Sequence, residues 1–475
     1  MKKTLLLLGG LFYFPVASQA QDKDISKPNI LFVLIDDLGK EWISQYGAEN
    51  INTPVFESLT QTGVKFTNCY SMPQSTPSRV TLLTGQYPYR HGWVNHWDAP
   101  RWGAGVHFDE TCNPSIPNKI REAGYVTAAA GKWQLDDFRV EPDAMNRVGF
   151  DEYCMWTGYE AGIQASANRY WDPYLHTKTG SKTYNGAFGE DIFSSFLIDF
   201  MRKNKDKPMF MYYPMCITHT PFTSTPLEPN VKGKIECHKA MVRYADYTIG
   251  KLVEEIERLG LREKTIIVVT TDNGTTGAIV GQIDGVSIQG GKAKTIESGI
   301  NAPLVISYPA SLPQGITSDA LVDFTDFMPT FAAMAGAELD NRYVYDGQSF
   351  AAILKGEQAD SPRTWIMSMG GHNNAKISEK GVENQYIFRD RVIRDKQYKL
   401  YVSTQRKPEK LFDLQADPYE TKNIIHQPGM QAVVKRLFAP VASMPDKDYD
   451  PIYKANPTQA WDVKASVKSQ QWKLK

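Results

Sequence analysis

Acidic residues follow two strongly apolar segments that lie far apart in the chain. Asp36 and Asp37 come directly after the first segment, and Asp272 and Asn273 follow the second. Carboxylate and amide oxygens are hard, negatively polarised ligands, which suit Ca²⁺ or Mg²⁺ better than zinc. The alternative is that each acid only caps the turn after its strand, as Asp and Asn often do. The repetition of the pattern at two sites favours a metal site.

A second candidate for chemistry is the segment Ser75-Thr76-Pro77-Ser78-Arg79. We expect Thr76 to be a helix N-cap with Pro77 at the first helical position. Ser75 would then lie just before a helix N-terminus, where backbone N–H groups and the helix dipole favour an anion. Arg79, one turn further on, adds a charge that suits a tetrahedral oxyanion. The alternative is an ordinary capped helix whose Arg pairs with a surface acid.

The apolar segments indicate how the acidic residues are positioned. Every residue from 30 to 35 is apolar, and residues 265–271 form a second run rich in Ile, Val and Thr. Such runs are typical of strands that are buried on both faces of a parallel sheet. In open α/β sheets, ligands bind beyond the carboxyl ends of the strands. We therefore expect both acidic pairs to lie at one edge of the same sheet.

Together with other motifs, these segments resemble the formylglycine-dependent sulfatases, an arylsulfatase-like family of the alkaline phosphatase superfamily. The segment from Ser75 to Arg79 matches the family signature in its serine form. The other matches extend over nearly the whole chain: Asp36-Asp37, Leu82-Leu83-Thr84-Gly85, His91-Gly92, Gly124-Tyr125-Val126-Thr127, Gly131-Lys132-Trp133, His219-Thr220-Pro221, Asp272-Asn273-Gly274, Gly290-Gly291-Lys292, Asp326-Phe327-Met328-Pro329-Thr330, Asp346-Gly347, Tyr398-Lys399-Leu400, Leu411-Phe412-Asp413-Leu414, and Asp417-Pro418 with Glu420.

The resemblance implies a fold and a cofactor. The expected fold class is α/β, with an alkaline-phosphatase-like mixed sheet flanked by helices and a smaller C-terminal α+β subdomain. In this family a Cys or Ser at the position of Ser75 is oxidised to formylglycine, whose hydrated aldehyde attacks sulfur. Calcium is the expected metal, and its implied ligands are Asp36, Asp37, Asp272, Asn273 and the modified Ser75.

The resemblance also assigns roles to four cationic residues. Arg79 would stabilise the aldehyde hydrate, while Lys132 and Lys292 would neutralise charge on the sulfate and on the leaving oxygen. His219 would bind sulfate and protonate the leaving group. The residues alone also allow a simpler interpretation, because lysines are usually solvated and a His beside a Thr-Pro turn is more often structural.

The chain departs from the family pattern at Gln134. The family usually has His two residues after the Lys of its Gly-Lys-Trp motif, whereas Lys132 here is followed at that distance by Gln134. Glutamine can hydrogen-bond to the aldehyde hydrate but cannot act as a base near neutral pH. Either another group takes the proton, or turnover is slow, or the site binds without turnover. Two alternatives to a sulfatase remain. One is a phosphodiesterase or phosphonate hydrolase of the same fold, since sulfate and phosphate esters are both tetrahedral oxyanions; the other, motivated by Gln134, is a non-catalytic binder of sulfated glycans.

Length and charge limit the possible classes further. The chain has 475 residues, which predicts more than one domain. Lys+Arg and Asp+Glu both number 53, so the net charge is zero and a nucleic-acid or anionic-membrane binder is not expected. Residues 1–20 combine two lysines, an apolar stretch and small residues before Ala20, which predicts a signal peptide and a periplasmic or secreted protein. The alternative is a short membrane anchor.

The domain boundaries follow from the patterns along the chain. Residues 21–361 are predicted to form the catalytic domain, with helices at 239–259 and 324–335. Residues 362–475 contain short apolar runs, such as Tyr386-Ile387-Phe388, Val392-Ile393 and 398–402, which predict a small antiparallel sheet. Five cysteines without CxxC spacing exclude a zinc framework or a disulfide scaffold and leave one or two bridges possible.

Substrate choice is the least determined feature. The expected partners are a sulfated small molecule or glycan and a sulfatase-maturating enzyme, and Gln134 and His372 are predicted substrate-binding residues. Aromatic side chains could stack on sugar rings, or they could pack beneath the surface. They form two groups with their neighbours: Trp93, His96, Trp97, Arg101 and Trp102, and then Trp156, Tyr159, Arg169, Tyr170 and Trp171.

Overall fold

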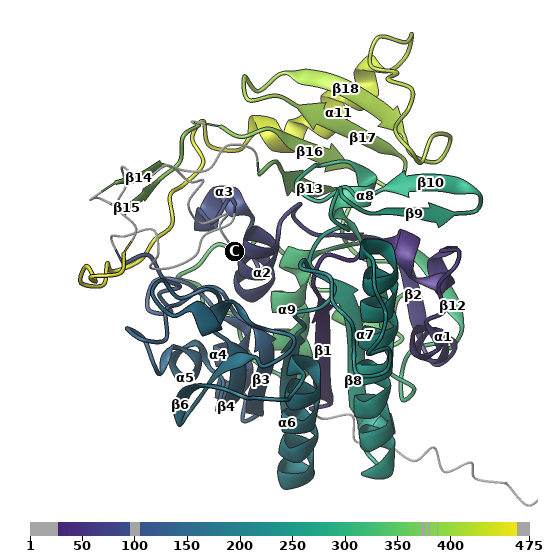
Figure 1. Cartoon of the computed structure of the whole chain (residues 1–475). Coiled ribbons are helices and arrows are strands. Elements are labelled where there is room, and N and C mark those ends of the chain that lie inside the picture. Colours follow the sequence, from purple (N-terminus) through teal and green to yellow (C-terminus); the bar gives the residue numbers. More distant parts are fainter. Residues whose placement is uncertain (1–26, 96–104, 372–375, 379–380, 387, 463–475) are drawn as a thin grey trace, which may run out of the picture.

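The predicted buried strands lie at the centre of a ten-stranded mixed sheet (Figure 1). The structure is a computed structural model that describes residues 27–95, 105–371, 376–378, 381–386 and 388–462. Strand β1 (Asn29–Ile35) lies between β7 and β8 and is parallel to both. In sheet order the strands are β12 (Ile316–Asp323), β2 (Val64–Tyr70), β11 (Asn301–Ser307), β8 (Thr265–Thr271), β1, β7 (Met209–Pro214), β3 (Val126–Lys132), β4 (Glu152–Trp156), β5 (Tyr174–Thr177) and β6 (Gly180–Thr183).

Strand β1 is apolar from Ile30 to Ile35 because helices cover both faces of the sheet. Phe32 and Leu34 join one buried cluster, and Leu31 and Val33 join the other. Burying one such side chain contributes roughly 1.5–3 kcal/mol. The first face is covered by α2 (Ser75–Thr84), α4 (Ile116–Glu122), α5 (Ala144–Val148), α9 (Phe327–Ala335) and α10 (Ala351–Leu354). The second is covered by α1 (Pro54–Gln61), α6 (Gly189–Asn204) and α7 (Lys234–Arg258).

The two helices predicted around 239–259 and 324–335 are both present. Helix α7 begins at Lys234, five residues earlier than predicted, and ends one residue before Leu259. Gly260 follows with φ 70°, a left-handed conformation that suits glycine after a helix. The second predicted helix is a short 3-10 turn at Phe324–Asp326 that continues into α9.

The C-terminal part contains the predicted antiparallel sheet. Its order is β13 (Ile366–Met369), β16 (Arg391–Arg394), β17 (Tyr398–Val402) and β18 (Pro408–Asp413), and α11 (Gln431–Ala442) packs against it (Figure 1). The strand predicted at Tyr386-Ile387-Phe388 was wrong: Tyr386 and Phe388 lie outside any strand, and residue 387 lies outside the described residues. Phe388 is buried beneath the Arg391 guanidinium, so its apolar character serves packing and not pairing. The domain boundary at residue 362 stays a prediction.

Shorter elements complete the described chain. They are α3 (Pro88–His91), α8 (Glu297–Ile300), the hairpins β9 (Val280–Ile283)–β10 (Val286–Gln289) and β14 (Lys376–Ser378)–β15 (Gly381–Glu383), and 3-10 turns at Lys40–Trp42, Ser44–Tyr46, Gln164–Ala167 and Arg262–Lys264. All five cysteines fall in the described part of the chain and are free thiols. No helix in that part has the length and apolarity to span a membrane. The predicted signal peptide lies outside the described residues.

Candidate active site

The two acidic pairs meet at the carboxyl edge of the large sheet, as the strand pattern predicts. Strands β1 and β8 pair in register up to Ile35 opposite Thr271. The Asp272 backbone N–H then donates to the Ile35 carbonyl (3.0 Å), so the chains leave the sheet side by side. Asp37 has φ 62°, a left-handed conformation that Asp tolerates better than most residues. This turn directs both carboxylates of the first pair toward the second.

Three carboxylates gather at this edge. Ligand oxygens of Asp36, Asp37 and Asp272 all lie within 4.8 Å of one another, and each residue is at most 1% exposed. The Asn273 side-chain amide donates to Asp37 Oδ1 (2.8 Å), which turns the Asn273 oxygen toward Ser75 Oγ, 3.3 Å away. Buried carboxylates require cations or hydrogen-bond donors to offset the loss of water. The site therefore depends on positive charge.

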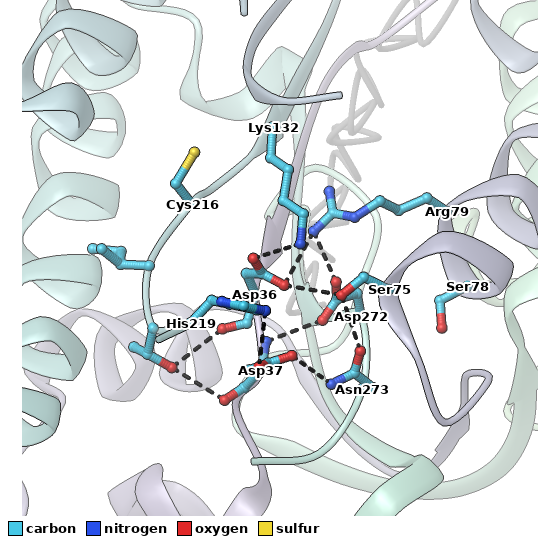
Figure 2. Close-up of polar contacts among 12 residues, drawn as sticks. Asp36, Asp37, Ser75, Ser78, Arg79, Lys132, Cys216, His219, Asp272 and Asn273 are labelled. Carbon is cyan, nitrogen blue, oxygen red and sulfur yellow. Dashed lines mark hydrogen bonds and ion pairs between the residues drawn. The ribbon is translucent and has the colours of Figure 1, made fainter. Parts of the chain in front are cut away.

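Ser75 lies at the start of α2, beside this carboxylate group (Figure 2). Its hydroxyl donates to Asp36 Oδ1 (3.1 Å). The prediction that Thr76 is the N-cap was wrong, because α2 begins at Ser75 and Gln74 is the capping residue, without a side-chain cap. Pro77 is tolerated as the third helical residue because the first turn of a helix has no internal N–H partners to lose. Ser75 thus has its own N–H among the free donors of the helix end.

Cations match the carboxylates nearly one to one. Arg79 Nη2 lies 2.8 Å from Asp272 Oδ2, Lys132 Nζ 2.7 Å from Asp36 Oδ2, and Lys292 Nζ 2.6 Å from Asp37 Oδ2 (Figure 2 labels the first two cations). Arg79 Nε and Nη1 are buried and have no hydrogen-bond partner among the described residues. The three N–H groups of these two nitrogens therefore remain for an anion.

Backbone contacts hold these cations in place. Gly131 precedes Lys132 with φ 128°, and a Cβ there would lie 2.0 Å from the Pro214 carbonyl oxygen, so only glycine lets β3 approach β7 this closely. The Lys292 N–H donates to the Thr275 carbonyl (3.0 Å), and the Ala293 N–H donates to the Pro73 carbonyl (2.7 Å). The loop that carries Lys292 is thus bound both to the segment after Asn273 and to the segment before Ser75.

The carboxylates have opposed pKa shifts. Burial alone would raise the pKa of Asp36, but the charges of Lys132 and Arg79 outweigh it and hold that pKa well below its usual range. Burial, reinforced by the charge of Asp36, raises the pKa of Asp272 to about 6. Burial thus destabilises the charged form of Asp272 despite the nearby cations. A divalent cation such as Ca²⁺, which prefers carboxylate oxygens, would stabilise that charged form.

His219 completes the group from the segment after β7. Its Nε2 lies 3.7 Å from Asp37 Oδ2. The Thr218 hydroxyl donates to the backbone carbonyls of Asp36 (3.2 Å) and Asp37 (3.1 Å), which ties this segment to the acidic turn. Burial, and then the charge of Lys292, hold the pKa of His219 well below its usual range. The imidazole is therefore a neutral hydrogen-bonding group in this environment.

The predicted substrate-binding residues have different outcomes. Gln134 follows β3 with φ 63° and is buried, and its Oε1 has no hydrogen-bond partner among the described residues. His372 lies outside the described residues, as do His96, Trp97, Arg101 and Trp102 of the first aromatic group. Trp93, Trp156 and Tyr170 are buried, which agrees with the alternative of packing beneath the surface.

Sequence reasoning missed the groups that hold the His219 segment. The Glu190 carboxylate, at the start of α6, accepts from the Cys216 and Ile217 N–H groups (2.8 and 3.2 Å). Arg169 donates to the Thr220 carbonyl and approaches His219. Neither residue stands in a motif or at a recognisable spacing, and Arg169 was expected only as part of a sugar-stacking group.

Comparisons with known proteins agree with this geometry. Residues 28–337 match the family described as Sulfatase, and residues 292–447 match the family described as N-sulphoglucosamine sulphohydrolase, C-terminal. The chain is 27% identical to the ulvan-active sulfatase of Formosa agariphila, over 89% of this chain and 82% of that protein. It is 26% identical to the N-acetylgalactosamine-6-O-sulfatase of Bacteroides thetaiotaomicron, over 90% and 96%. The crystal structure of Ps i-CgsB shares its fold, with TM-score 0.74 and 24% identity over 94% of this chain and 97% of that chain.

The mixed sheet flanked by helices, with a buried group of acidic and cationic side chains at its carboxyl edge, defines an alkaline-phosphatase-like fold. Because the Sulfatase match covers more than half of it, the chain belongs to the sulfatase family. Its enzyme class is that of the sulfuric ester hydrolases.

Proposed function

We propose that the protein hydrolyses sulfate esters of a carbohydrate, with formylglycine made from Ser75 and with a bound calcium ion. One observation carries the proposal: Ser75 Oγ lies 3.1 Å from Asp36 Oδ1 and 3.3 Å from Asn273 Oδ1, at the centre of the group of acids and cations. A nucleophile at this position is adjacent both to metal ligands and to anion-binding groups. Formylglycine would supply an aldehyde hydrate as that nucleophile.

The proposed calcium ligands are the four oxygen donors Asp36, Asp37, Asp272 and Asn273, together with the modified Ser75. The crowding of three carboxylates and the raised pKa of Asp272 support a divalent cation here. When bound, calcium would supply Lewis-acid polarisation of a sulfate oxygen.

The cations have proposed roles that follow from their positions. Arg79 reaches from the helix that carries Ser75, so its free N–H groups can hold an oxygen of the hydrate. Lys132 and Lys292, which pair with Asp36 and Asp37, would offset charge on the sulfate and on the leaving oxygen. His219 Nε2 would hydrogen-bond to the substrate near the bond that breaks.

Gln134 gives the site one feature that favours a second function. A glutamine with an unpartnered oxygen can hold a hydroxyl by hydrogen bonding, but it cannot remove a proton. Slow turnover or binding of a sulfated glycan without turnover would follow if no other group acts as the base. We keep glycan binding as the second candidate on this observation alone.

Substrate class and location are proposed by analogy with the relatives. Their names refer to sulfatases active on ulvan, N-acetylgalactosamine and N-acetylglucosamine. We infer a sulfated glycan substrate, bound in part by Gln134 and His372, and a periplasmic or secreted protein that depends on a sulfatase-maturating enzyme. No nucleic-acid partner and no membrane span are proposed.

Peptide mass spectrometry across Ser75 is the decisive test. Protein from its native host, or produced together with a maturating enzyme, should show loss of two hydrogens at Ser75, and this form should release sulfate from sulfated glycans in the presence of calcium. Unmodified serine in native protein contradicts the mechanism. Faster cleavage of a matched phosphate diester or phosphonate than of an aryl sulfate would replace the proposed function with the phosphodiesterase or phosphonate hydrolase alternative. Tight glycan binding by the modified protein without sulfate release would favour the second candidate.

A further inference from the structure

Arg169 occupies a buried position directly behind His219. Its guanidinium lies 4.6 Å from the Trp156 ring centroid and 5.1 Å from that of Tyr170, and the residue is only 6% exposed. The Tyr170 hydroxyl donates to the backbone carbonyls of Cys216 (3.0 Å) and His219. Stacking and hydrogen bonding thus fix the guanidinium relative to the His219 segment.

In the contact between Arg169 and His219, only Arg169 can be the hydrogen-bond donor. Arg169 Nη2 lies 2.9 Å from His219 Nδ1. A guanidinium has five N–H donors and no acceptor, and it stays protonated in proteins. The Nδ1 atom must therefore accept and carries no proton, so the ring proton is on Nε2.

A second neighbour of the same nitrogen has to be weighed. The Thr220 carbonyl oxygen lies 2.7 Å from Nδ1 and would accept a hydrogen bond if Nδ1 carried a proton. In that arrangement the Nδ1 hydrogen would face the Nη2 hydrogens, and one Nη2 donor would lose its partner in a buried site. In the first arrangement Arg169 donates to both the Thr220 carbonyl and Nδ1, so every buried donor of Nη2 is used.

We propose that Arg169 is a positioning residue that holds His219 in the tautomer with its proton on Nε2. That nitrogen lies 3.7 Å from Asp37 Oδ2, so its N–H points into the group that surrounds Ser75 (Figure 2). On the proposed function, an oxygen of the hydrate made from Ser75 would form a bond to sulfur as the bond from sulfur to the leaving oxygen breaks. The electron pair of the broken bond moves to the leaving oxygen, which accepts a hydrogen bond from Nε2–H. The imidazole keeps this proton; a water molecule protonates the leaving alcohol, and the hydroxide that remains is neutralised by the proton that the attacking hydrate releases.

The tautomer can be measured without turnover. Protein labelled with ¹⁵N-histidine contains eight histidines, and a His219→Gln variant identifies the signals of His219. We expect a protonated Nε2 and an unprotonated Nδ1 in calcium-loaded protein. Arg169→Met, which keeps the length but removes the donor, should move the proton toward Nδ1, and Arg169→Lys should restore the original tautomer. A proton on Nδ1 in the parent protein, or an unchanged tautomer in Arg169→Met, overturns the proposal.

Kinetics separate this role from a structural one. Arg169→Met should reduce kcat for a sugar sulfate, whose alcohol is a poor leaving group, roughly tenfold more than for an activated aryl sulfate. An equal loss on both substrates contradicts the proposal.

The matched control is Arg139→Met. The Arg139 guanidinium also stacks on a tryptophan (4.2 Å to the Trp461 centroid) and donates to a carbonyl, that of Ala161 (2.7 Å), but it contacts no site residue. The Arg139→Met variant should lower activity on the sugar sulfate and on the aryl sulfate equally, or not at all. If matured parent protein hydrolyses no sulfate ester, the proposed function fails, and the tautomer measurement still decides the role of Arg169.

Discussion

Two buried groups of charged residues in this protein differ in how completely they are paired. The first is the active-site group around Asp36, Asp37 and Asp272. The second, which we call the interdomain cluster, consists of Glu297, Lys399, Glu420, Tyr401 and Tyr70 and joins the large sheet to the C-terminal sheet. Lys399 is 0% exposed, and its Nζ lies 2.9 Å from Glu297 Oε1 and 2.9 Å from Glu420 Oε1.

The carboxylates of the interdomain cluster have donors on every oxygen. The Tyr401 hydroxyl and the Glu297 backbone N–H donate to Glu420 (2.6 and 2.7 Å), and the Tyr70 hydroxyl donates to Glu297 Oε2 (2.6 Å). Although burial opposes it, Lys399 and Arg394 lower the pKa of Glu297 to about 2.

In the active-site group, by contrast, burial raises the pKa of Asp272 to about 6, and two Arg79 nitrogens have no partner among the described residues. A fully paired group contributes to stability, whereas an incompletely paired group can bind a metal and an anion. The two groups should therefore respond differently to substitution.

The largest expected effect is loss of activity in Ser75→Ala. Without an oxidisable side chain no nucleophile forms, so sulfate release should fall by at least about 10³-fold. The free energy of unfolding should change by less than about 1 kcal/mol, because the lost hydroxyl is one donor to an incompletely paired group. Sulfate release and urea unfolding measure the two quantities. Ser75→Cys is the matched control and should keep activity where the maturating enzyme accepts cysteine; full activity in Ser75→Ala would exclude Ser75 as the nucleophile.

Lys399→Met should have the opposite effect to Ser75→Ala: it should lower stability and keep most of the activity. The substitution leaves Glu297 and Glu420 buried without their shared cation, and breaking such a pair costs about 3–5 kcal/mol. Urea unfolding should show this loss, while the folded fraction keeps most of its kcat. Lys396→Met, at an exposed ion pair with Asp319 and Asp360, is the control and should cost at most about 1 kcal/mol. A cost for Lys399→Met no larger than for this control would show that the interdomain cluster does not stabilise the fold.

Much of the fold and the centre of the site could be predicted from local pattern. The run at 30–35 is apolar at every position because helices cover both faces of β1, and this property is visible in the sequence. Since β1 and β8 pair in register, acids at their ends had to meet. The roles of these residues rested on the resemblance to sulfatases, because acids after strands also cap turns.

Features set by tertiary contacts could not be predicted. Lys399 and Glu420 were recognised only as motif residues, since nothing local indicates that both pair with Glu297 more than a hundred residues away. The start of α2 was misplaced because Pro77 fits any position in a first helical turn. Phe388 was taken for a strand residue because a short apolar run fits a buried loop equally well.

A pH titration of the unfolding free energy tests whether the charge of Glu297 in the interdomain cluster stabilises the fold. The pKa of Glu297 is lowered to about 2 in the folded protein and lies near 4.3 in an unfolded chain, so its charged form favours folding. This contribution, about 3 kcal/mol, is complete above the unfolded pKa and is lost as the pH falls through about 2. The difference in unfolding free energy between the parent protein and Glu297→Gln should therefore shrink between pH 5 and pH 2. A constant difference over this range would mean that the Glu297 charge does not contribute.

The smallest expected effect is the stabilisation of the active-site group by calcium. A ligand that binds only the folded state at 100 times its Kd adds about 2.7 kcal/mol. Calcium should raise the Tm of the parent protein, and a chelator should reverse the shift. Asp37→Asn should lose most of this increment because one oxygen charge is removed, whereas Lys399→Met should keep it, since distant sites without shared partners contribute additively. If Lys399→Met also abolishes the rise in Tm caused by calcium, the two groups are coupled. The C-terminal sheet would then help to form the metal site through Glu297 and the loop of Lys292.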